Sequence, residues 1–284
     1  MLTDLHAHST ASDGDLEPAA LVAAAARAGV TTLAVTDHDT MDGIPEALAA
    51  GEAHGVRVIP GIELTVRVPT GSMHLLGYFT TATPRPLVDR LAGVSQFREE
   101  RIRRIVDRLG ELGIALAWDD VRGRAAGQLG RPHVAAALVD AGHAASLDEA
   151  FDRWLADGRP AHVPSKGLEP DAAVQAVRES GGAPVLAHPA SLALPDRHLS
   201  SFVQRLRAFG LVGIEVHRPE HRPQQRDAFA TIARRLRLVA SGGSDFHRPA
   251  GPFALGDTGS PGLPDDAVDR LWKGLVPRNS PSTP

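Results

Sequence analysis

Short apolar runs alternate with longer helical patterns along most of the chain, and this alternation limits the possible folds more than any other feature. It predicts parallel strands joined by crossover helices. Seven runs are candidate strands, at residues 2–5, 32–36, 56–60, 73–79, 184–187, 212–216 and 238–241. Helical patterns occupy residues 18–28, 44–54, 170–179, 199–209, 223–236 and 265–275. Seven βα units predict an α/β barrel, with an open doubly wound sheet as the alternative.

The rhythm changes in the middle of the chain, where the patterns are helical and strand signals are few. We therefore expect a helical insertion at residues 84–164. The barrel would consist of residues 1–83 and 165–276. The Pro/Ser-rich tail at residues 277–284 is expected to be disordered.

Two local patterns stand out in the expected insertion. Ser146 and Glu149 have the spacing of a capping box at the start of a helix. Residues 93–112 carry apolar residues at helical spacing and five arginines. The arginines between Arg98 and Arg108 alternate with acids, which favours a salt-bridged solvent face over an RNA-contacting surface.

Composition excludes several classes of function. The chain has no cysteine, which excludes disulfides, iron–sulfur clusters, thiolate zinc sites and a cysteine nucleophile. Its formal charge of -4 gives no bulk attraction to nucleic acid or anionic lipid, so a polyanion would need a local patch. There is neither a secretory signal pattern nor an apolar run of membrane length. We expect a cytoplasmic protein that does not bind membranes, and no feature implies a stable protein partner.

Polar residues with metal-binding side chains gather at the ends of the candidate strands. Loops that follow parallel strands converge on one face of such a fold, so these side chains are expected to share one cleft. His74 fits this arrangement if its strand runs against its neighbours, because it stands at a strand start. The candidate ligands are His6, His8, Asp13, His38, Glu63, His74, His188, Asp245 and His247.

A cluster of His, Asp and Glu without sulfur suits Zn²⁺, Mn²⁺ or Fe²⁺. His6 and His8 project to the same side of an extended segment and can reach one ion. Nine ligands are too many for one ion, so two or three divalent ions are implied. Adjacent ions clamp the attacking and leaving oxygens of an in-line displacement. The native metal is left open by these ligand types.

Each candidate also has a plainer interpretation. A single His at a strand end is more often a hydrogen-bonded core residue than a ligand. Asp13 lies in a Ser-Asp-Gly sequence that favours a turn. Asp37 and Asp39 suit helix caps or groups that support a ligand, and Glu215 suits orienting a neighbour or pairing with an arginine.

Six motifs, in order, resemble those of the PHP (polymerase and histidinol phosphatase) superfamily of phosphoesterases. They are Asp4–Ser9 with Ser12–Gly14, Thr36–Asp39, Gly61–Glu63, His74–Gly77, Ala187–Pro189 and Gly243–His247. The resemblance implies a distorted (β/α)7 barrel with a trinuclear metal centre. The implied ligand sets are His6, His8, Glu63 and Asp245 for one ion, Glu63, His74 and His188 for a second, and Asp13, His38 and His247 for a third.

The chain is most similar to the stand-alone subgroup of this family that hydrolyses nucleoside 3′,5′-bisphosphates, some members of which trim short RNA from the 5′ end. The subgroup motifs are 130–133, 160–164 with residue 166, and 213–216 leading to 219–221. This chain departs from the subgroup at His217, where an aromatic residue is common. The resemblance implies four side chains that grip phosphate oxygens, namely Arg131, His133, Lys166 and His221. Arg131 beside Pro132 alternatively only begins a helix, and Lys166 is alternatively solvated.

The expected function is therefore a metal-dependent phosphoesterase that removes the 3′-phosphate of nucleoside 3′,5′-bisphosphates or trims short 5′-phosphorylated RNA. The family chemistry implies in-line attack by a metal-bridged hydroxide, with Asp245, His188 and His247 as candidate catalytic residues. The insertion would cap the cleft and bring Arg131 and His133 to a second phosphate. The alternatives are a histidinol-phosphate phosphatase, a non-catalytic metal-binding module, and an amidohydrolase-like enzyme, which usually has a modified lysine at a strand end.

Overall fold

A computed structural model describes residues 1–69, 71–91, 94–164, 167–260 and 262–273. Seven strands form one sheet in chain order, as the sequence predicts. They are β1 (Leu2–Asp4), β2 (Val30–Val35), β3 (Arg57–Val66), β4 (Met73–Tyr78), β5 (Ala183–Leu186), β6 (Gly213–His217) and β7 (Val239–Gly242).

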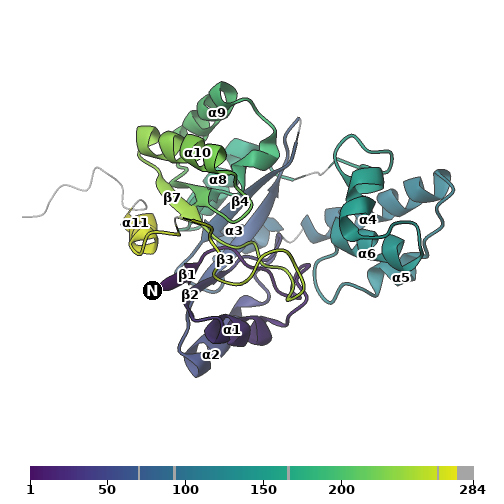
Figure 1. Cartoon of the computed structure of the whole chain (residues 1–284), viewed down its shortest axis with the longest axis horizontal. Coiled ribbons are helices and arrows are strands. Elements are labelled where there is room, and N and C mark those ends of the chain that lie inside the picture. The colour runs from purple at the N-terminus through teal and green to yellow at the C-terminus, as the bar shows by residue number, and fades with distance from the viewer. Residues whose placement is uncertain (70, 92–93, 165–166, 261, 274–284) are drawn as a thin grey trace, which may run out of the picture.

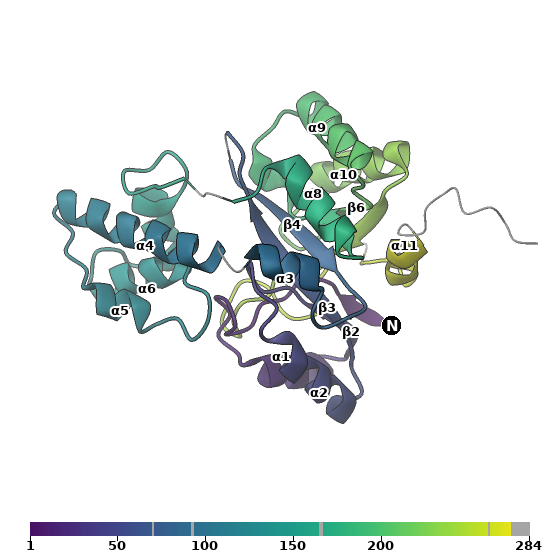
Figure 2. The ribbon, with the colours of Figure 1, turned by 180° about the vertical axis from the view of Figure 1, so that it is seen from behind.

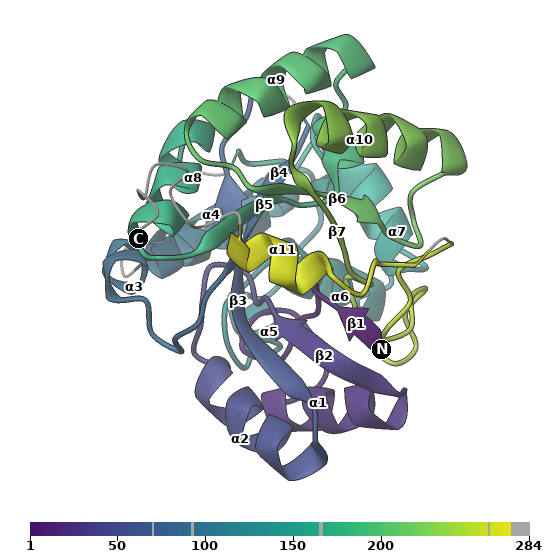
Figure 3. The same cartoon turned by 90° about the vertical axis from the view of Figure 1, so that its left-hand side faces the viewer.

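The sheet curls into a distorted barrel. Strands β1 to β3 pair in parallel, and so do β5 to β7, while β4 is antiparallel to both β3 and β5. The expected reversal of the strand that begins near His74 is confirmed. The two edges meet where the Leu5 amide donates to the Gly242 carbonyl at 3.3 Å and the Asp245 amide to the His6 carbonyl at 2.8 Å. Figure 3 shows the strands around a common axis, with α11 (Ala267–Lys273) across one end.

Helices cover the outside of the barrel. Helices α1 (Pro18–Arg27) and α2 (Ile44–His54) lie on one side, and α8 (Pro170–Glu179), α9 (Asp196–Ala208) and α10 (Pro223–Leu236) on the other (Figure 1). Four of these five begin with proline in the first turn, where its missing N–H costs nothing. Their apolar faces and the outward faces of the strands form the main core, which includes Leu21, Leu33, Val177 and Leu206.

Strand β3 is longer than its sequence pattern suggests. We expected it to end at Pro60, but it continues to Val66, and Glu63 lies within the strand instead of in the loop after it. The extension pairs with β4 in a regular antiparallel ladder from Gly61 opposite Tyr78 to Val66 opposite Met73. Pairing with β4 therefore decides where this strand ends.

A second body lies beside the barrel (Figures 1 and 2) and is called here the helical segment, residues 94–164. Its elements are α4 (Val94–Glu111), α5 (Trp118–Arg122), α6 (Arg131–Asp140), α7 (Leu147–Ala150) and the π-helical turn η1 (Phe151–Leu155). It has an apolar cluster of its own that includes Ile105, Leu109, Val134, Leu138 and Leu155.

The described part of this segment contains helices and no strand, as expected. Ser146 caps α7 by accepting from the Glu149 amide at 3.2 Å. The first helix after residue 84, α3 (Arg85–Leu91), packs instead on the barrel, because Leu87 and Leu91 join the main core. We therefore propose that the insertion begins after α3.

Three sequence expectations meet the limits of the described residues. The tail 277–284 and Lys166 lie outside them. The closing helix expected at 265–275 is present as α11, and its last two expected residues also fall outside. Within the described ranges, no helix combines the length and apolar character needed to cross a membrane.

Candidate metal centre

The metal-binding side chains meet at one end of the barrel. Eight of the nine expected ligands form three overlapping groups in which one donor atom from each residue lies within 4.8 Å of the others. The groups are His6, His8, Glu63 and Asp245; His8, Asp13, His38 and His247; and His38, Glu63 and His74. The ninth, His188, has its Nε2 atom 2.9 Å from Glu63 Oε1 and 3.2 Å from His74 Nδ1.

The strands continue to pair after they end, and this pairing fixes the loops that carry the ligands. The Thr36 amide donates to the Ala7 carbonyl at 2.9 Å, and the His8 amide to the Phe246 carbonyl at 2.8 Å. An isolated bridge also joins His38 to Glu63. Neighbouring ligand loops are thus held by backbone hydrogen bonds, which preorganise the cluster.

Two buried aspartates tie these loops further. Asp37 accepts from the Ser9 amide, the Ser9 hydroxyl and the Ser12 hydroxyl at 2.6–2.8 Å. Asp4 accepts from the Ser244 amide and hydroxyl, and from the amides of His6 and Gly256. Neither belongs to the three ligand groups, so the structure gives Asp37 the supporting role that was one of its two sequence interpretations.

Backbone strain concentrates at the same place. Three of the five non-glycine residues with positive φ in the described chain are Asp39 (51°), His188 (21°) and Asp245 (56°). Such conformations cost of order 1–3 kcal/mol each and persist where the surrounding structure enforces them. The fold therefore accepts strain in order to direct His188 and Asp245 toward the cluster.

Glu63 lies at the middle of the cluster and is buried. Its Oε1 atom is 3.0 Å from His74 Nδ1, and its Oε2 atom is 3.0 Å from His38 Nδ1 and 3.3 Å from His8 Nε2. Burial alone would raise the pKa of Glu63, but the surrounding His74, His38 and His6 hold that pKa well below its ordinary value. An ionised Glu63 can therefore face two neighbouring cations at once.

The donor atoms fit a metal because several of them, although close to carboxylate oxygens, form no hydrogen bond of regular geometry among the described residues. These buried atoms are His6 Nε2, both ring nitrogens of His8, His38 Nδ1 and Asp245 Oδ1. Leaving a buried polar atom unpaired costs about 1–3 kcal/mol. Burial alone would lower the pKa of His8, but the carboxylates of Asp245 and Glu63 raise it to about 10. The cluster thus favours positive charge, as a divalent cation site does.

Three imidazoles are oriented by a partner on their other nitrogen. His6 Nδ1 donates to Glu215 Oε1 at 3.1 Å, His188 Nδ1 to the Ser191 hydroxyl at 2.9 Å, and His247 Nδ1 to the Asp245 carbonyl at 2.8 Å. Their Nε2 lone pairs then point into the cluster. Such supporting bonds fix the tautomer and ring orientation of a metal ligand.

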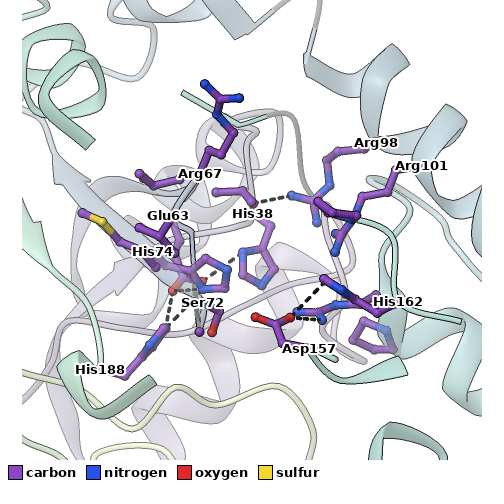
Figure 4. A pocket seen from close by; sticks show the side chains of 18 of the residues that line it. His38, Glu63, Arg67, Ser72, His74, Arg98, Arg101, Asp157, His162 and His188 are labelled. Carbon is purple, nitrogen blue, oxygen red and sulfur yellow. Dashed lines mark hydrogen bonds and ion pairs between the residues drawn. The ribbon is translucent and has the colours of Figure 1, made fainter. Parts of the chain in front are cut away.

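A cavity of about 600 Å³ opens above the cluster, between the barrel and the helical segment. Figure 4 shows Glu63, His74 and His188 on one side of it, and Arg98 and Arg101 on the other. Arg131 also lines the cavity. Burial, followed by repulsion from Arg131 and Arg98, lowers the pKa of Arg101 to about 10. The wall opposite the cluster therefore carries closely spaced positive charge.

Of the four expected phosphate-binding residues, the structure places Arg131 at the cavity and two others away from it. Arg131 lines the cavity and donates to Asp157 at 3.4 Å and to the Leu155 carbonyl at 3.3 Å. His133 is not among the cavity residues, and its Nδ1 atom accepts from the Gly130 amide at 3.0 Å. His221 is also outside the cavity and is buried, with Nδ1 donating to the Val216 carbonyl at 3.1 Å. Lys166 lies outside the described residues.

Sequence reasoning missed Arg98 and Arg101, which it placed in a solvent-exposed face. Arg98 is only 17% exposed, forms an ion pair with Asp39 and donates to the Thr65 hydroxyl at 3.1 Å. Arg101 donates to the Val163 carbonyl at 2.7 Å. The available signal was their spacing of three, which puts both on one face of α4.

The comparison with protein families decides between the fold alternatives. The model of the PHP domain matches residues 4–155, which is more than half of the chain. The chain belongs to the PHP domain family. As a PHP protein it has relatives with several activities at comparable identity.

A Salmonella typhimurium protein named 5′-3′ exoribonuclease Rnm is 36% identical, over 90% of this chain and 88% of that protein. A Chromobacterium violaceum 3′,5′-nucleoside bisphosphate phosphatase is 32% identical, over 87% of each chain. An Eggerthella lenta phosphoribosyl 1,2-cyclic phosphate 1,2-diphosphodiesterase is 34% identical, over 87% of this chain and 94% of that one. Sequence identity therefore does not choose among these reactions.

Two solved structures share the whole PHP fold of this chain. A Chromobacterium violaceum protein described as an amidohydrolase, with bound sulfate and no metal, has a TM-score of 0.88 at 30% identity and covers 95% of this chain and 97% of its own. A Bifidobacterium adolescentis protein described as a metal-dependent phosphoesterase has a TM-score of 0.86 at 31% identity and covers 97% of each chain. The distorted (β/α)7 barrel implied by the sequence is thus confirmed.

Proposed function

We propose that this chain is a metal-dependent phosphoesterase that removes the 3′-phosphate of nucleoside 3′,5′-bisphosphates. The observation that carries the proposal is a single cavity with a His and carboxylate cluster at one side and Arg98, Arg101 and Arg131 at the other. One phosphate would be held at the cluster and a second by the arginines. The curated bisphosphate phosphatase relative supports this choice of substrate.

The ligands would divide among two or three ions. His6, His8, Glu63 and Asp245 would hold one, and Asp13, His38 and His247 a second, with His8 also within reach. Glu63, His74 and His188 would hold a third. Mn²⁺, Fe²⁺ and Zn²⁺ all suit these ligands. When bound, divalent ions make a water more acidic and neutralise charge on the phosphoryl oxygens in an in-line displacement.

The chain's own residues would orient and hold the substrate. Arg101 and Arg131 present guanidinium groups to the cavity, and such groups bind phosphate through charge-assisted hydrogen bonds. His188 and His247 each use Nδ1 for a hydrogen bond within the protein, so Nε2 is the nitrogen that each would offer to a metal ion beside the reacting phosphate. Asp245 Oδ1 lies between His6 and His8. It would help to hold the ion beside which the reacting phosphate is bound.

The test measures inorganic phosphate released by the Mn²⁺-reconstituted protein from adenosine 3′,5′-bisphosphate, adenosine 3′-monophosphate and histidinol phosphate. We expect kcat/KM for the bisphosphate to exceed that for the monophosphate by roughly 10-fold or more, because one charged hydrogen bond is worth about 1.5–3 kcal/mol. His247→Ala should remove activity on all three. Equal or faster release from histidinol phosphate would favour the histidinol-phosphate phosphatase alternative.

Arginine variants separate the two anion positions. Arg131→Met and Arg101→Met should lower kcat/KM for the bisphosphate by roughly 10- to 100-fold and change the monophosphate by about twofold or less. Arg104→Met is the matched control, since Arg104 is exposed on the same helix. An equal loss on both substrates in Arg131→Met would refute a second phosphate site at the helical segment.

A second candidate is the trimming of short 5′-phosphorylated RNA. Two features favour it: the exoribonuclease relatives, and a cavity wall that would bind a 5′-phosphate as readily on RNA as on a mononucleotide. The measurement is mononucleotide release from a 5′-phosphorylated trinucleotide and from its 5′-hydroxyl form. Rapid release from the phosphorylated form, with slow hydrolysis of the bisphosphate, would make RNA the substrate.

Failure on every phosphoester by metal-replete protein would leave the non-catalytic interpretation. The amidohydrolase interpretation has less support in the described residues. Their one lysine, Lys273, lies in α11 and does not line the cavity. The centre of the cluster is occupied instead by the carboxylate of Glu63.

A further inference from the structure

Arg218 is a fully buried arginine that the proposed chemistry leaves without a role. It follows β6 and is 1% exposed. Its Nη1 atom donates to Glu215 Oε2 at 3.2 Å, and its Nη2 atom donates to Asp245 Oδ2 at 3.0 Å and to Glu220 Oε2 at 3.2 Å. One guanidinium thus bridges a carboxylate of the metal cluster and the carboxylate that orients His6.

An irregularity in β6 places Arg218 there. Glu215 pairs with Ser241, and His217 pairs with the very next residue, Gly242, so β6 carries one extra residue at this point. In a regular strand, residues three apart point to opposite faces, and one extra residue reverses that phase. The bulge lets Glu215 and Arg218 face the same interior. Gly242 permits it, since a Cβ there would overlap the His217 carbonyl.

The contacts of Arg218 determine which carboxylate oxygens remain available. Asp245 Oδ2 is taken by Arg218, and Oδ1 is left 3.2 Å from His6 Nε2 and 3.1 Å from His8 Nε2. Glu215 gives Oε2 to Arg218 and to the His188 amide, and Oε1 to His6 Nδ1. Without the guanidinium, Asp245 Oδ2 and Glu215 Oε2 would both lose a charged donor inside the protein.

We propose that Arg218 is a positioning residue of the metal centre, which holds Asp245 in a one-oxygen binding mode and keeps Glu215 on His6. A buried arginine is expensive to desolvate, and an apolar residue of similar size is often equally stable in such a place. Its role is therefore assigned to the centre and not to stability alone. The inference rests on metal binding by the cluster and does not depend on which phosphoester is the substrate.

The test titrates Mn²⁺ into metal-free full-length protein, with free Mn²⁺ followed by electron paramagnetic resonance. We expect Arg218→Met to weaken at least one Mn²⁺ site by about 10- to 100-fold, the usual effect of losing a group that supports metal ligands. Arg218→Lys keeps the charge but cannot bridge both carboxylates, so its loss should be intermediate. Circular dichroism checks that each variant is folded at the titration temperature.

Glu220→Gln is the matched control. It removes the exposed partner of the same guanidinium, 60% exposed, and leaves Asp245 and Glu215 in place. It should bind Mn²⁺ like the unaltered protein. If folded Arg218→Met binds Mn²⁺ with the affinity and stoichiometry of the unaltered protein, the proposal is overturned. If Arg218→Met does not fold, the same result for Arg218→Lys overturns it. If the Arg218 variants lose Mn²⁺ affinity as expected but the unaltered protein releases no phosphate, the result would count against the proposed function and not against the role of Arg218.

Discussion

Single buried residues fix the loops that carry the candidate metal ligands. Asp4 is the clearest case, because its two oxygens accept four hydrogen bonds, one from the nearby His6 and three from Ser244 and Gly256 near the other end of the chain. Two of the donors belong to Ser244, beside the ligand Asp245, and one is the amide of His6 itself. The carboxylate therefore closes the barrel where its first and last strands end.

Replacing this carboxylate by an amide should be costly. In Asp4→Asn one oxygen becomes an NH₂ group that faces donors, so we expect the free energy of unfolding to fall by about 3 kcal/mol. Urea denaturation of metal-free protein measures it. Asp171→Asn is the control, since it alters a surface ion pair with Arg205 that is worth at most about 1 kcal/mol. Equal losses in the two variants would contradict a closing role for Asp4.

His221 offers a pH test of a buried residue that does not reach the cavity. Burial lowers its pKa, and its Nδ1 donates to the Val216 carbonyl. Because the folded pKa lies below the unfolded value near 6.5, the contribution of neutral His221 is complete above about pH 6.5 and is lost as pH falls through the folded pKa. The stability difference between the unaltered protein and His221→Asn should therefore shrink from pH 7.5 to pH 5. A difference that stays constant would show that folding does not lower the pKa of His221.

At the scale of elements, the helical segment docks on the barrel through a short loop. The Gln128 amide donates to the Ala11 carbonyl at 2.9 Å, two residues before the ligand Asp13. A Cβ on the neighbouring Gly127 would overlap the same carbonyl. The close approach of these two backbone segments therefore requires glycine at position 127.

Two glycine substitutions in the helical segment should change the free energy of unfolding in opposite directions. Gly127→Ala would push its loop away from Ala11, and we expect a loss of about 1–3 kcal/mol in stability and weaker substrate binding. Gly110→Ala is the counterpart, since Gly110 lies in α4 with open space around its Cβ position, and it should gain about 0.5–1 kcal/mol. Urea denaturation and KM for the bisphosphate give both comparisons. A stable Gly127→Ala with unchanged KM would rule out the docking contact.

The elements also show where sequence reasoning succeeds. Strands, the capping Ser146 and the approach of the metal ligands depend on local pattern and on the rule that loops after parallel strands converge, so they were predictable. The end of β3 was not, since its last residues are strand through pairing with β4. The spacing of Arg98 and Arg101 predicts that they share one side of α4. It does not predict that this side faces the cavity and the barrel instead of solvent. His221 matched a motif, and only the structure shows that it is buried and does not line the cavity.

At the scale of the molecule, two bodies with separate apolar clusters share one cavity. The barrel contributes the candidate metal ligands, on loops that are hydrogen-bonded to one another, and the helical segment contributes Arg101 and Arg131 to the cavity. Arg98 connects the two bodies through its ion pair with Asp39. The two parts of the proposed reaction, metal binding and recognition of a second anion, are therefore assigned to different bodies.

This division can be measured by hydrogen exchange. Adding Mn²⁺ to metal-free protein should slow amide exchange in the barrel loops at residues 5–13, 36–39 and 243–247, because an ion present at about 100 times its Kd stabilises the state that binds it by about 2.7 kcal/mol. The helical segment should be unaffected at this stage. A non-hydrolysable analogue of adenosine 3′,5′-bisphosphate, added to the metal-loaded protein, should then slow exchange at the start of α4 and near residues 155–163. Inorganic phosphate alone, which has no second anion, should protect the loops further and leave the helical segment unchanged. Protection of the helical segment by Mn²⁺ alone would instead mean that metal binding closes the cavity without substrate, and the two bodies would have to be treated as one binding unit.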